Sequence, residues 1–172
     1  LISFAVMPFK YEKERIFNSG VALKRVRENS QCTIVLDNDS LLESNPNLTA
    51  KACYGIANSA ISHIVKSLET TEISSETNIL TTSKDGQSME ESLRDSLKML
   101  YQNASPNTVK SSMVYVAGGE NIPVGVINSI KNLSNGITNE SNSQINMSSS
   151  DESKVVMLSS VQTMTKFDNY DP

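Results

Sequence analysis

Short apolar runs alternate with longer segments of helical periodicity along this chain, and such alternation is typical of a sheet covered by helices. Residues 2–9 and 33–37 are apolar along most of their length, as strands covered on both faces are. Residues 12–28, between them, have the period of a helix. We therefore expect an α/β protein with a layered α+β arrangement.

The clearest helical signal follows Pro46. Apolar residues recur there at three- and four-residue intervals, at Ala57, Ala60, Ile61, Ile64, Val65 and Leu68. This spacing predicts a long core helix that ends near residue 68. Residues 69–78 are polar and are expected to be a connector, and residues 79–83 a short strand.

Four further elements are predicted after this strand. Ser88 followed by Glu91 is a capping box that opens a helix, and a strand runs into Gly118-Gly119. A second helix is expected between Pro123 and Gly136. Residues 143–149 and 154–163 then alternate enough to be a closing pair of strands.

The predicted organisation has four segments. The last strands and helix of one domain occupy residues 1–48, and the core helix occupies residues 49–68. Residues 69–166 would form a second domain, a mixed sheet of four strands covered by two helices, while residues 167–172 are expected to be a frayed tail. In this scheme the core helix divides the second sheet from an incomplete sheet edge.

Composition excludes several functional classes. The 19 acidic and 15 basic residues are scattered, which argues against a nucleic-acid interface. No apolar run is long enough to cross a bilayer, so no direct membrane insertion is expected. With two cysteines and one histidine, a metal site is not expected, and no sequence motif of a catalytic nucleophile is present.

Two short stretches leave two interpretations open. The triplet Asp37-Asn38-Asp39 ends an apolar strand and is either a turn into a helix or part of a ligand site at the strand's carboxyl end. Gly118-Gly119 is either a structural turn or an anion-binding nest.

A set of three residues indicates a more specific chemistry. Asn38 lies at a strand end, while Tyr54 and Asn58 are four residues apart and share a face of the core helix. An aromatic ring and two amides suit a purine base, which needs a stacking surface and partners for its polar edge. The alternative is a core tyrosine beside a surface asparagine.

The order of motifs resembles the tubulin and FtsZ superfamily. "RENSQCTIVLDNDSLL" is similar to its strand with an Asn-Asp signature, and "KACYGIANSAISHIVKSL" to its core helix. "FAVMPFKYEKER" resembles the FtsZ "PF-x-F-E-G" segment, and "SSMVYVAGGENIPVGVINSIKNL" resembles a strand, glycine turn and helix of the carboxyl-terminal domain. The resemblance covers nearly the whole chain, and the "LDND" form is closer to archaeal FtsZ-like and tubulin-like proteins than to bacterial FtsZ.

The resemblance implies a GTP-binding role. Asn38, Tyr54 and Asn58 would hold guanine, while Glu12 and Arg15 would lie near the ribose and phosphates, although Lys13 replaces the family's glycine. The family's phosphate-binding loop lies upstream of these motifs. GTP or GDP would therefore bind the full-length protein, and this carboxyl-terminal half alone would not hold it tightly.

The resemblance also implies a cytoplasmic protein of cell division or cell shape whose subunits, or related FtsZ-like subunits, associate head to tail into filaments. Where the family carries catalytic acids, Ser75 and Asn78 have the nearest spacing, and neutral side chains cannot supply a carboxylate's charge. No catalytic residue is assigned, and enzymatic activity is left open. The alternative is a non-hydrolysing structural or regulatory module related to FtsZ.

Overall fold

The computed structural model describes residues 1–68, 73, 77–118, 122–135, 143–148, 153–162 and 165–170. The strands of this described part are β1 (Ile2–Met7), β2 (Cys32–Asp37), β3 (Thr77–Thr82), β4 (Val109–Ala117), β5 (Ser143–Ser148) and β6 (Lys154–Val161). The helices are α1 (Lys13–Glu28), α2 (Asn38–Ser44), α3 (Ala50–Ser67), α4 (Met89–Asn103) and α5 (Val124–Asn135), with 3₁₀ turns η1 (Pro106–Thr108) and η3 (Lys166–Tyr170).

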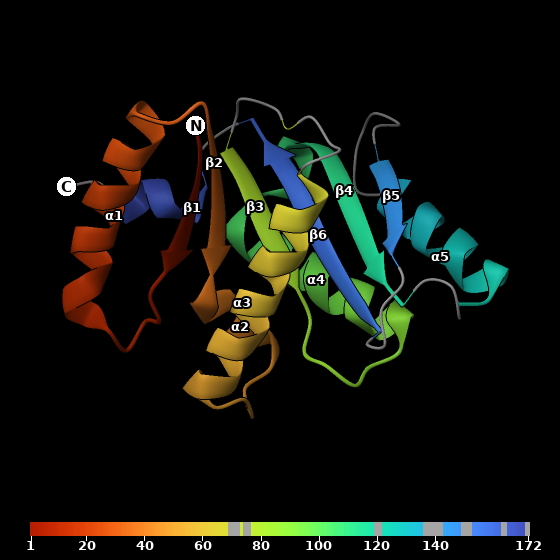
Figure 1. Ribbon diagram of the computed structural model, residues 1–172. Coiled ribbons are helices and arrows are strands. Elements are labelled where there is room, and N and C mark those ends of the chain that lie inside the picture. Colours follow the sequence, from red (N-terminus) through yellow and green to blue (C-terminus); the bar gives the residue numbers. More distant parts are fainter. Residues whose placement is uncertain are drawn as a thin grey trace.

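The described strands form one six-stranded sheet in the order β1-β2-β3-β6-β4-β5 (Figure 1). β1 is parallel to β2 and β2 to β3, whereas β6 is antiparallel to both of its neighbours and β5 is parallel to β4. The fold is therefore α/β with a mixed sheet, as predicted. β3, β6, β4 and β5 are the four strands expected for the second half, and α4 and α5 pack against them.

The two halves of the chain share this one sheet, whereas the sequence predicted a sheet edge and a separate four-stranded sheet. β2 pairs directly with β3, with Ile34 opposite Asn78 and Leu36 opposite Leu80. α3 is the crossover between these two parallel strands and covers one face of the sheet, and it does not separate two sheets (Figure 1). The predicted sheet edge is thus continuous with the predicted second sheet.

The expected closing pair of strands is corrected. β5 and β6 do not pair, because β4 lies between them in the sheet. All eight residues of β6 are buried, which suits a central strand, whereas β5 carries the exposed Met147 and lies at an edge. Alternating hydrophobicity identifies both segments as strands but contains no information about which strands are neighbours.

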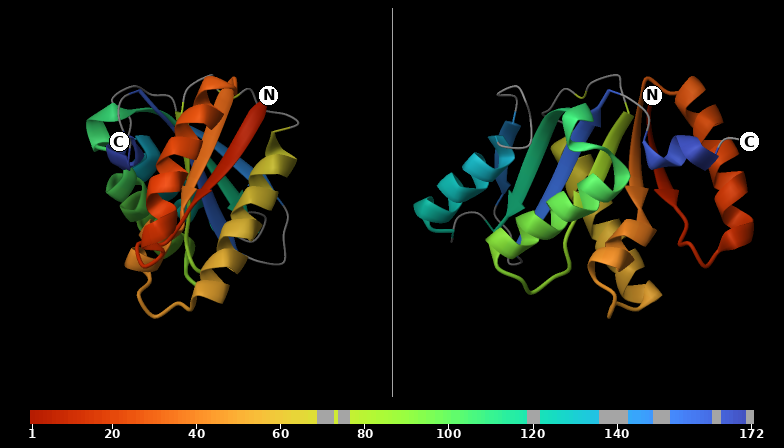
Figure 2. Two further views of the ribbon diagram at one scale, coloured as in Figure 1. Left: turned by 90° about the vertical axis from the view of Figure 1, so that its left-hand side faces the viewer. Right: turned by 180° about the vertical axis from the view of Figure 1, so that it is seen from behind.

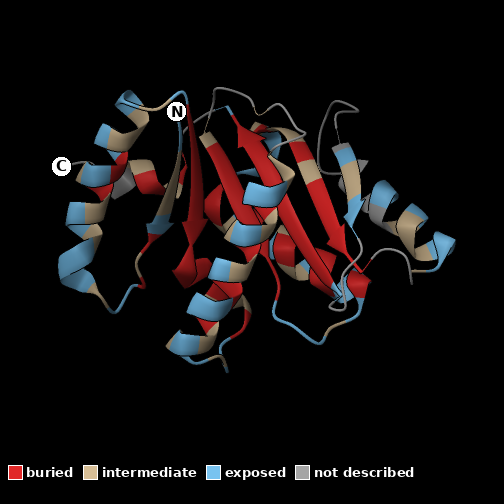
Figure 3. Cartoon of the chain, in the orientation of Figure 1, coloured by how far each residue is buried: buried red, intermediate tan, exposed pale blue. Residues whose placement is uncertain are grey.

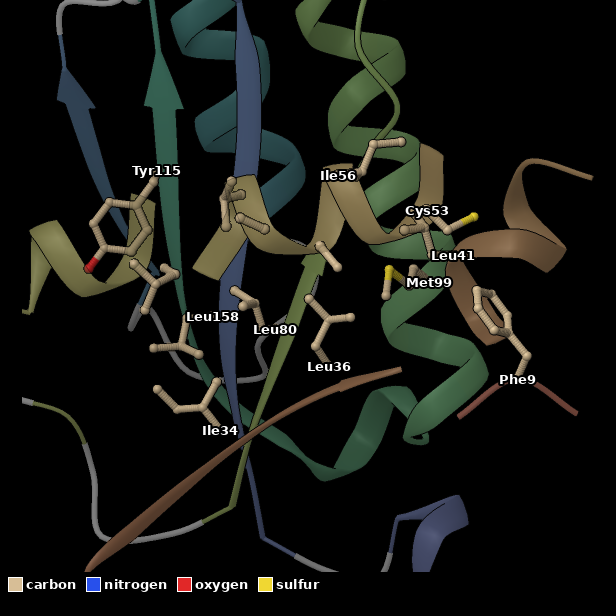
Figure 4. Packing of buried hydrophobic residues seen from close by; sticks show 14 of the residues in the cluster. Phe9, Ile34, Leu36, Leu41, Cys53, Ile56, Leu80, Met99, Tyr115 and Leu158 are labelled. Atoms are coloured by element: carbon tan, nitrogen blue, oxygen red, sulfur yellow. The ribbon is translucent and has the colours of Figure 1, made fainter. Parts of the chain in front are cut away.

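Side chains that alternate along the strands form two cores on opposite faces of the sheet. On one face, Ile34, Leu36, Leu80 and Leu158 pack beneath α3 (Figure 4). On the other face, the cluster around Ile79, Val155 and Met157 packs against α4, and Val35 belongs to a third cluster with Met7, Leu23 and Phe167. Figure 2 shows α3 and α4 on opposite sides of the sheet, and Figure 3 shows that the central strands are the buried layer.

Local signals place the element ends close to where they were expected. Ser88 and Glu91 form the capping box of α4, with the two hydrogen bonds at 3.2 and 3.3 Å. Gly118 has a positive φ of 76°, and its N–H donates to the Ser148 carbonyl oxygen at 3.0 Å, which supports a structural turn at this residue. Gly119 lies outside the described residues. The connector is shorter than expected, because β3 begins at Thr77 and includes Asn78.

The carboxyl-terminal segment is not frayed over its described part. Residues 166–170 form η3, which lies beside α1 (Figure 2). Phe167 is 2% exposed and belongs to the cluster that contains Leu23 and Val35. The expectation of a frayed tail is wrong here because one buried aromatic anchors the segment, while residues 171 and 172 lie outside the described part.

Candidate functional site

The parallel pairing of β1 and β2 brings two loop segments to one edge of the sheet. Met7 lies opposite Asp37, so both strands end at the same level. Residues 8–15, which follow β1, and residues 38–44, which form α2, therefore start side by side. Ligands of open α/β sheets bind at this carboxyl edge.

Both acids of the polar triplet after β2 have structural partners. Asp37 is the N-cap of α2, since its carboxylate accepts from Asp39 N–H at 3.3 Å and Ser40 N–H at 3.1 Å. Asp39 accepts the Lys10 backbone N–H at 3.0 Å, and its carboxylate lies 3.1 Å from Lys10 Nζ. The pKa of Lys10 lies above its ordinary value because Glu43 and Asp39 stabilise the ammonium.

Asn38, between these acids, is the first residue of α2 and is 1% exposed. Its Oδ1 is buried and accepts no hydrogen bond from any group in the described part of the chain. A buried acceptor without a donor is costly, so native proteins rarely keep one that has no ligand, water or function. The triplet is therefore a turn into a helix, as its simpler interpretation held, and it also contains one buried amide oxygen without a hydrogen-bond donor.

Three aromatic rings lie at the same edge. Phe9 is buried; its ring centroid lies 5.2 Å from that of Tyr11, with which it stacks, and 5.5 Å from that of Tyr54, which meets it edge-on. Tyr11 and Tyr54 are 63% and 42% exposed. Tyr54 is thus not a core tyrosine, and part of its surface is free for another ring. Asn58, four residues along α3, is also exposed.

Glu12 and Arg15 lie at the start of α1, beside these rings. Glu12 accepts Phe9 N–H at 3.1 Å through Oε2, while its Oε1 lies 3.0 Å from Arg15 Nη1. Both residues line a shallow depression of about 370 Å³, together with Tyr11, Lys13 and Glu14. The structure therefore places Glu12, Arg15 and Tyr54 at the same edge of the sheet. Phe9 connects them, because it contacts both Glu12 and Tyr54. Asn38 lies at the end of the neighbouring strand, β2.

Of the two residues at the predicted catalytic-loop positions, the structure describes only Asn78. Asn78 lies inside β3, is 3% exposed and donates to Cys32 Sγ at 3.2 Å. This corrects the expectation that residue 78 belongs to the connector. Ser75 lies outside the described residues.

Two residues at this edge were missed from the sequence. Tyr11 could have been noticed, because it follows Phe9 by two residues and precedes the start of a helix. Lys166 could not, since its ammonium contacts Asp37 Oδ2 across 129 residues of sequence and lies 2.9 Å from Ser40 Oγ.

The thiols and metal-binding side chains of the described residues suit binding more than covalent chemistry. Burial raises the pKa of the Cys32 and Cys53 thiols, which disfavours the thiolate that a nucleophile needs. Within the described residues, no group of three metal-binding side chains gathers. The helices described here include none with the length and hydrophobicity needed to span a membrane.

Comparison of the fold with solved structures finds the FtsZ and CetZ proteins. An FtsZ dimer from M. jannaschii has a TM-score of 0.67 and 14% identity, over 92% of this chain and 54% of that one. CetZ from Methanosaeta thermophila has a TM-score of 0.61 and 16% identity, over 95% of this chain and 53% of that one. CetZ2 from Haloferax volcanii, in a GTPγS-bound protofilament, has a TM-score of 0.53 and 16% identity, over 90% and 54%.

These likenesses show that the chain has the tubulin/FtsZ fold. It spans about half the length of those structures, which is consistent with their carboxyl-terminal half. No protein-family model matches the sequence, and no curated protein does. The resemblance inferred from motif order is therefore confirmed at the level of the fold.

Proposed function

We propose that this chain is the carboxyl-terminal half of a GTP-binding protein that assembles head to tail into filaments. In this proposal Asn38, Tyr54 and Asn58 hold the guanine base. Glu12 and Arg15 lie toward the ribose and phosphates, and the phosphate-binding loop is supplied by the other half of the full-length protein.

The observation that carries the proposal is the unsatisfied Oδ1 of Asn38. Guanine presents an N1–H and an amino group along one edge, so a carbonyl acceptor satisfies the base and the buried amide together. Adenine has an acceptor at N1, so it can offer this oxygen only its N6 amino group, whereas guanine offers two adjacent donors. The exposed ring of Tyr54 adds a stacking surface at the same edge of the sheet.

The test is the affinity of the full-length protein for fluorescent GTP and ATP analogues. Replacing Asn38 by Ala should weaken GTP binding by about 0.5–1.5 kcal/mol, the net value of one hydrogen bond, and should reduce the preference over ATP. Asn18→Ala is the matched control, because Asn18 is an exposed amide on α1. Equal GTP binding by Asn38→Ala and the unmodified protein would contradict the assignment.

Assembly is the second part of the proposal. The fold neighbours include an FtsZ dimer and a CetZ2 protofilament, and a head-to-tail contact that does not close produces filaments. Sedimentation and electron microscopy of the full-length protein with GTP or GDP test this directly. Particles that remain monomeric with either nucleotide would argue against a filament-forming protein.

We also propose that GTP turnover is slow. Asn78 has a neutral, buried side chain that donates to Cys32 Sγ, so it cannot present a negative charge to a neighbouring subunit. This favours a filament protein that binds GTP and hydrolyses it slowly, or a non-hydrolysing partner of such filaments. GTP turnover under assembly conditions separates these two from an active GTPase, for which hydrolysis would be rapid.

A further inference from the structure

The carboxyl-terminal segment, residues 165–170, attaches to the first half of the chain at three points. The first is Phe167, which is buried among Met7, Leu23 and Val35 on the sheet face opposite α3. Figure 2 shows the segment beside α1 at the β1 end of the sheet. Burial of a complete aromatic side chain is a substantial anchor for so short a segment.

The second point is an ion pair between Asp168 and Arg27 of α1. Arg27 Nη1 lies 2.6 Å from Asp168 Oδ1, and both side chains are about one-quarter exposed, at 23% and 25%. Asp168 Oδ2 also accepts the Thr165 N–H at 2.6 Å and its hydroxyl at 3.0 Å. The same carboxylate therefore closes the turn of the segment and fastens it to α1.

The third point is Lys166, which reaches the candidate site. Its ammonium contacts the Asp37 carboxylate, whose side chain is 2% exposed, and lies 2.9 Å from Ser40 Oγ. Asp37 is the N-cap of α2, and Asn38 is the next residue. A cation from the far end of the chain thus neutralises the buried carboxylate that sets the first turn of α2.

We infer that residues 165–170 are a clamp that positions Asn38, with Lys166 as the positioning residue acting through Asp37. The inference rests on the proposed guanine-binding role of Asn38. Without Lys166, the buried carboxylate of Asp37 lacks its cation, and a buried charge without a partner is strongly destabilising. Loss of this partner therefore weakens the cap of α2 and loosens the turn that carries Asn38.

Coupling between two sites is reciprocal. If the docked clamp improves nucleotide binding, then bound nucleotide must tighten the clamp by the same factor. The docking of residues 165–170 would then depend on whether nucleotide is bound to the first half of the chain.

The test uses the full-length protein with Lys166→Met, Lys166→Arg and the control Lys98→Met, which removes an exposed lysine of α4. Lys166→Met should weaken GTP binding at least about fivefold, the lower end of typical coupling between sites, and should reduce the preference for GTP over ATP. Lys166→Arg should restore most of both, and Lys98→Met should change neither. Asp168→Asn, which loosens the clamp without touching Asp37, should weaken GTP binding in the same direction.

Hydrogen exchange provides a readout that is independent of nucleotide. Lys166→Met should speed amide exchange in residues 38–44 of the nucleotide-free protein, and GTP should slow exchange in residues 165–170 of the unmodified protein. Unchanged exchange in residues 38–44 would overturn the clamp, as would equal loss of GTP and ATP affinity. If the unmodified protein binds no guanine nucleotide, the proposed function fails, while exchange in residues 38–44 of Lys166→Met still decides whether the clamp exists.

Discussion

Asn78 Nδ2 donates a hydrogen bond to Cys32 Sγ at 3.2 Å, which joins β3 to β2 where the two halves of the chain meet. Both side chains are buried. The position that the motif comparison matched to a catalytic acid is therefore a structural contact of the sheet.

Replacing Asn78 by Asp should destabilise the protein at neutral pH by roughly 1–3 kcal/mol, because a carboxylate would be buried beside a thiol. The new carboxyl should have a raised pKa, so the lost stability should return as the pH falls. Urea unfolding at pH 7 and pH 5 measures this. Faster GTP turnover by the variant would contradict our structural interpretation.

Replacing Tyr54 by Ala should weaken GTP binding by the full-length protein by about 1–3 kcal/mol, the range for losing an aromatic that stacks on a base. Tyr54→Phe should keep most of the affinity, because the ring remains. Tyr101→Ala is the matched control, since Tyr101 is similarly exposed at 39% but lies on α4. Equal losses for Tyr54→Ala and Tyr101→Ala would show that Tyr54 has no specific role.

Acid should weaken the docking of the carboxyl-terminal segment. Desolvation alone would raise the pKa of Asp168, but hydrogen bonds from Thr165 and the Arg27 guanidinium hold it below its ordinary 3.8. The unfolded state therefore binds this proton more readily. The stabilisation is present above pH 3.8 and is lost as the pH falls through the lower, folded-state pKa.

The measurement is the free energy of unfolding of the unmodified protein and of Asp168→Asn as a function of pH. The difference should be constant near neutrality and should shrink from about pH 4 downward. A difference that does not change with pH would show that the Asp168 charge makes no contribution to docking.

The outer edge of β1 should make the isolated chain associate. No strand of the described part pairs with this edge, and Ile2 and Val6 are 44% and 46% exposed. An unpaired apolar edge strand is a template for pairing with another chain. Light scattering should therefore show species larger than a monomer at high concentration.

A lysine on this edge should reduce the association, because a charge opposes edge pairing. Val6→Lys should shift the chain toward a monomer. Val65→Lys, on the exposed face of α3, should not, although Val65 is equally exposed at 49%. An ideal monomer for the unmodified chain at high concentration would contradict the prediction.

The sequence by itself determined the elements and their ends. Periodicity identified the core helix, the capping box located the start of α4, and the polar triplet after residue 36 marked where β2 gives way to α2. These signals depend on contacts between residues that are close in the sequence, so the sequence predicts them directly. The order of the motifs was also enough to indicate the tubulin/FtsZ fold.

Only the tertiary structure decided which elements are neighbours. It placed β4 between β5 and β6, joined β2 to β3 and docked Phe167 against the first half of the chain. It also showed that Lys166 contacts Asp37, and that Oδ1 of the next residue, Asn38, is buried without a hydrogen-bond donor. Strand pairing and the partner of a buried charge depend on residues far apart in the chain, and a periodic pattern carries no information about such distant partners.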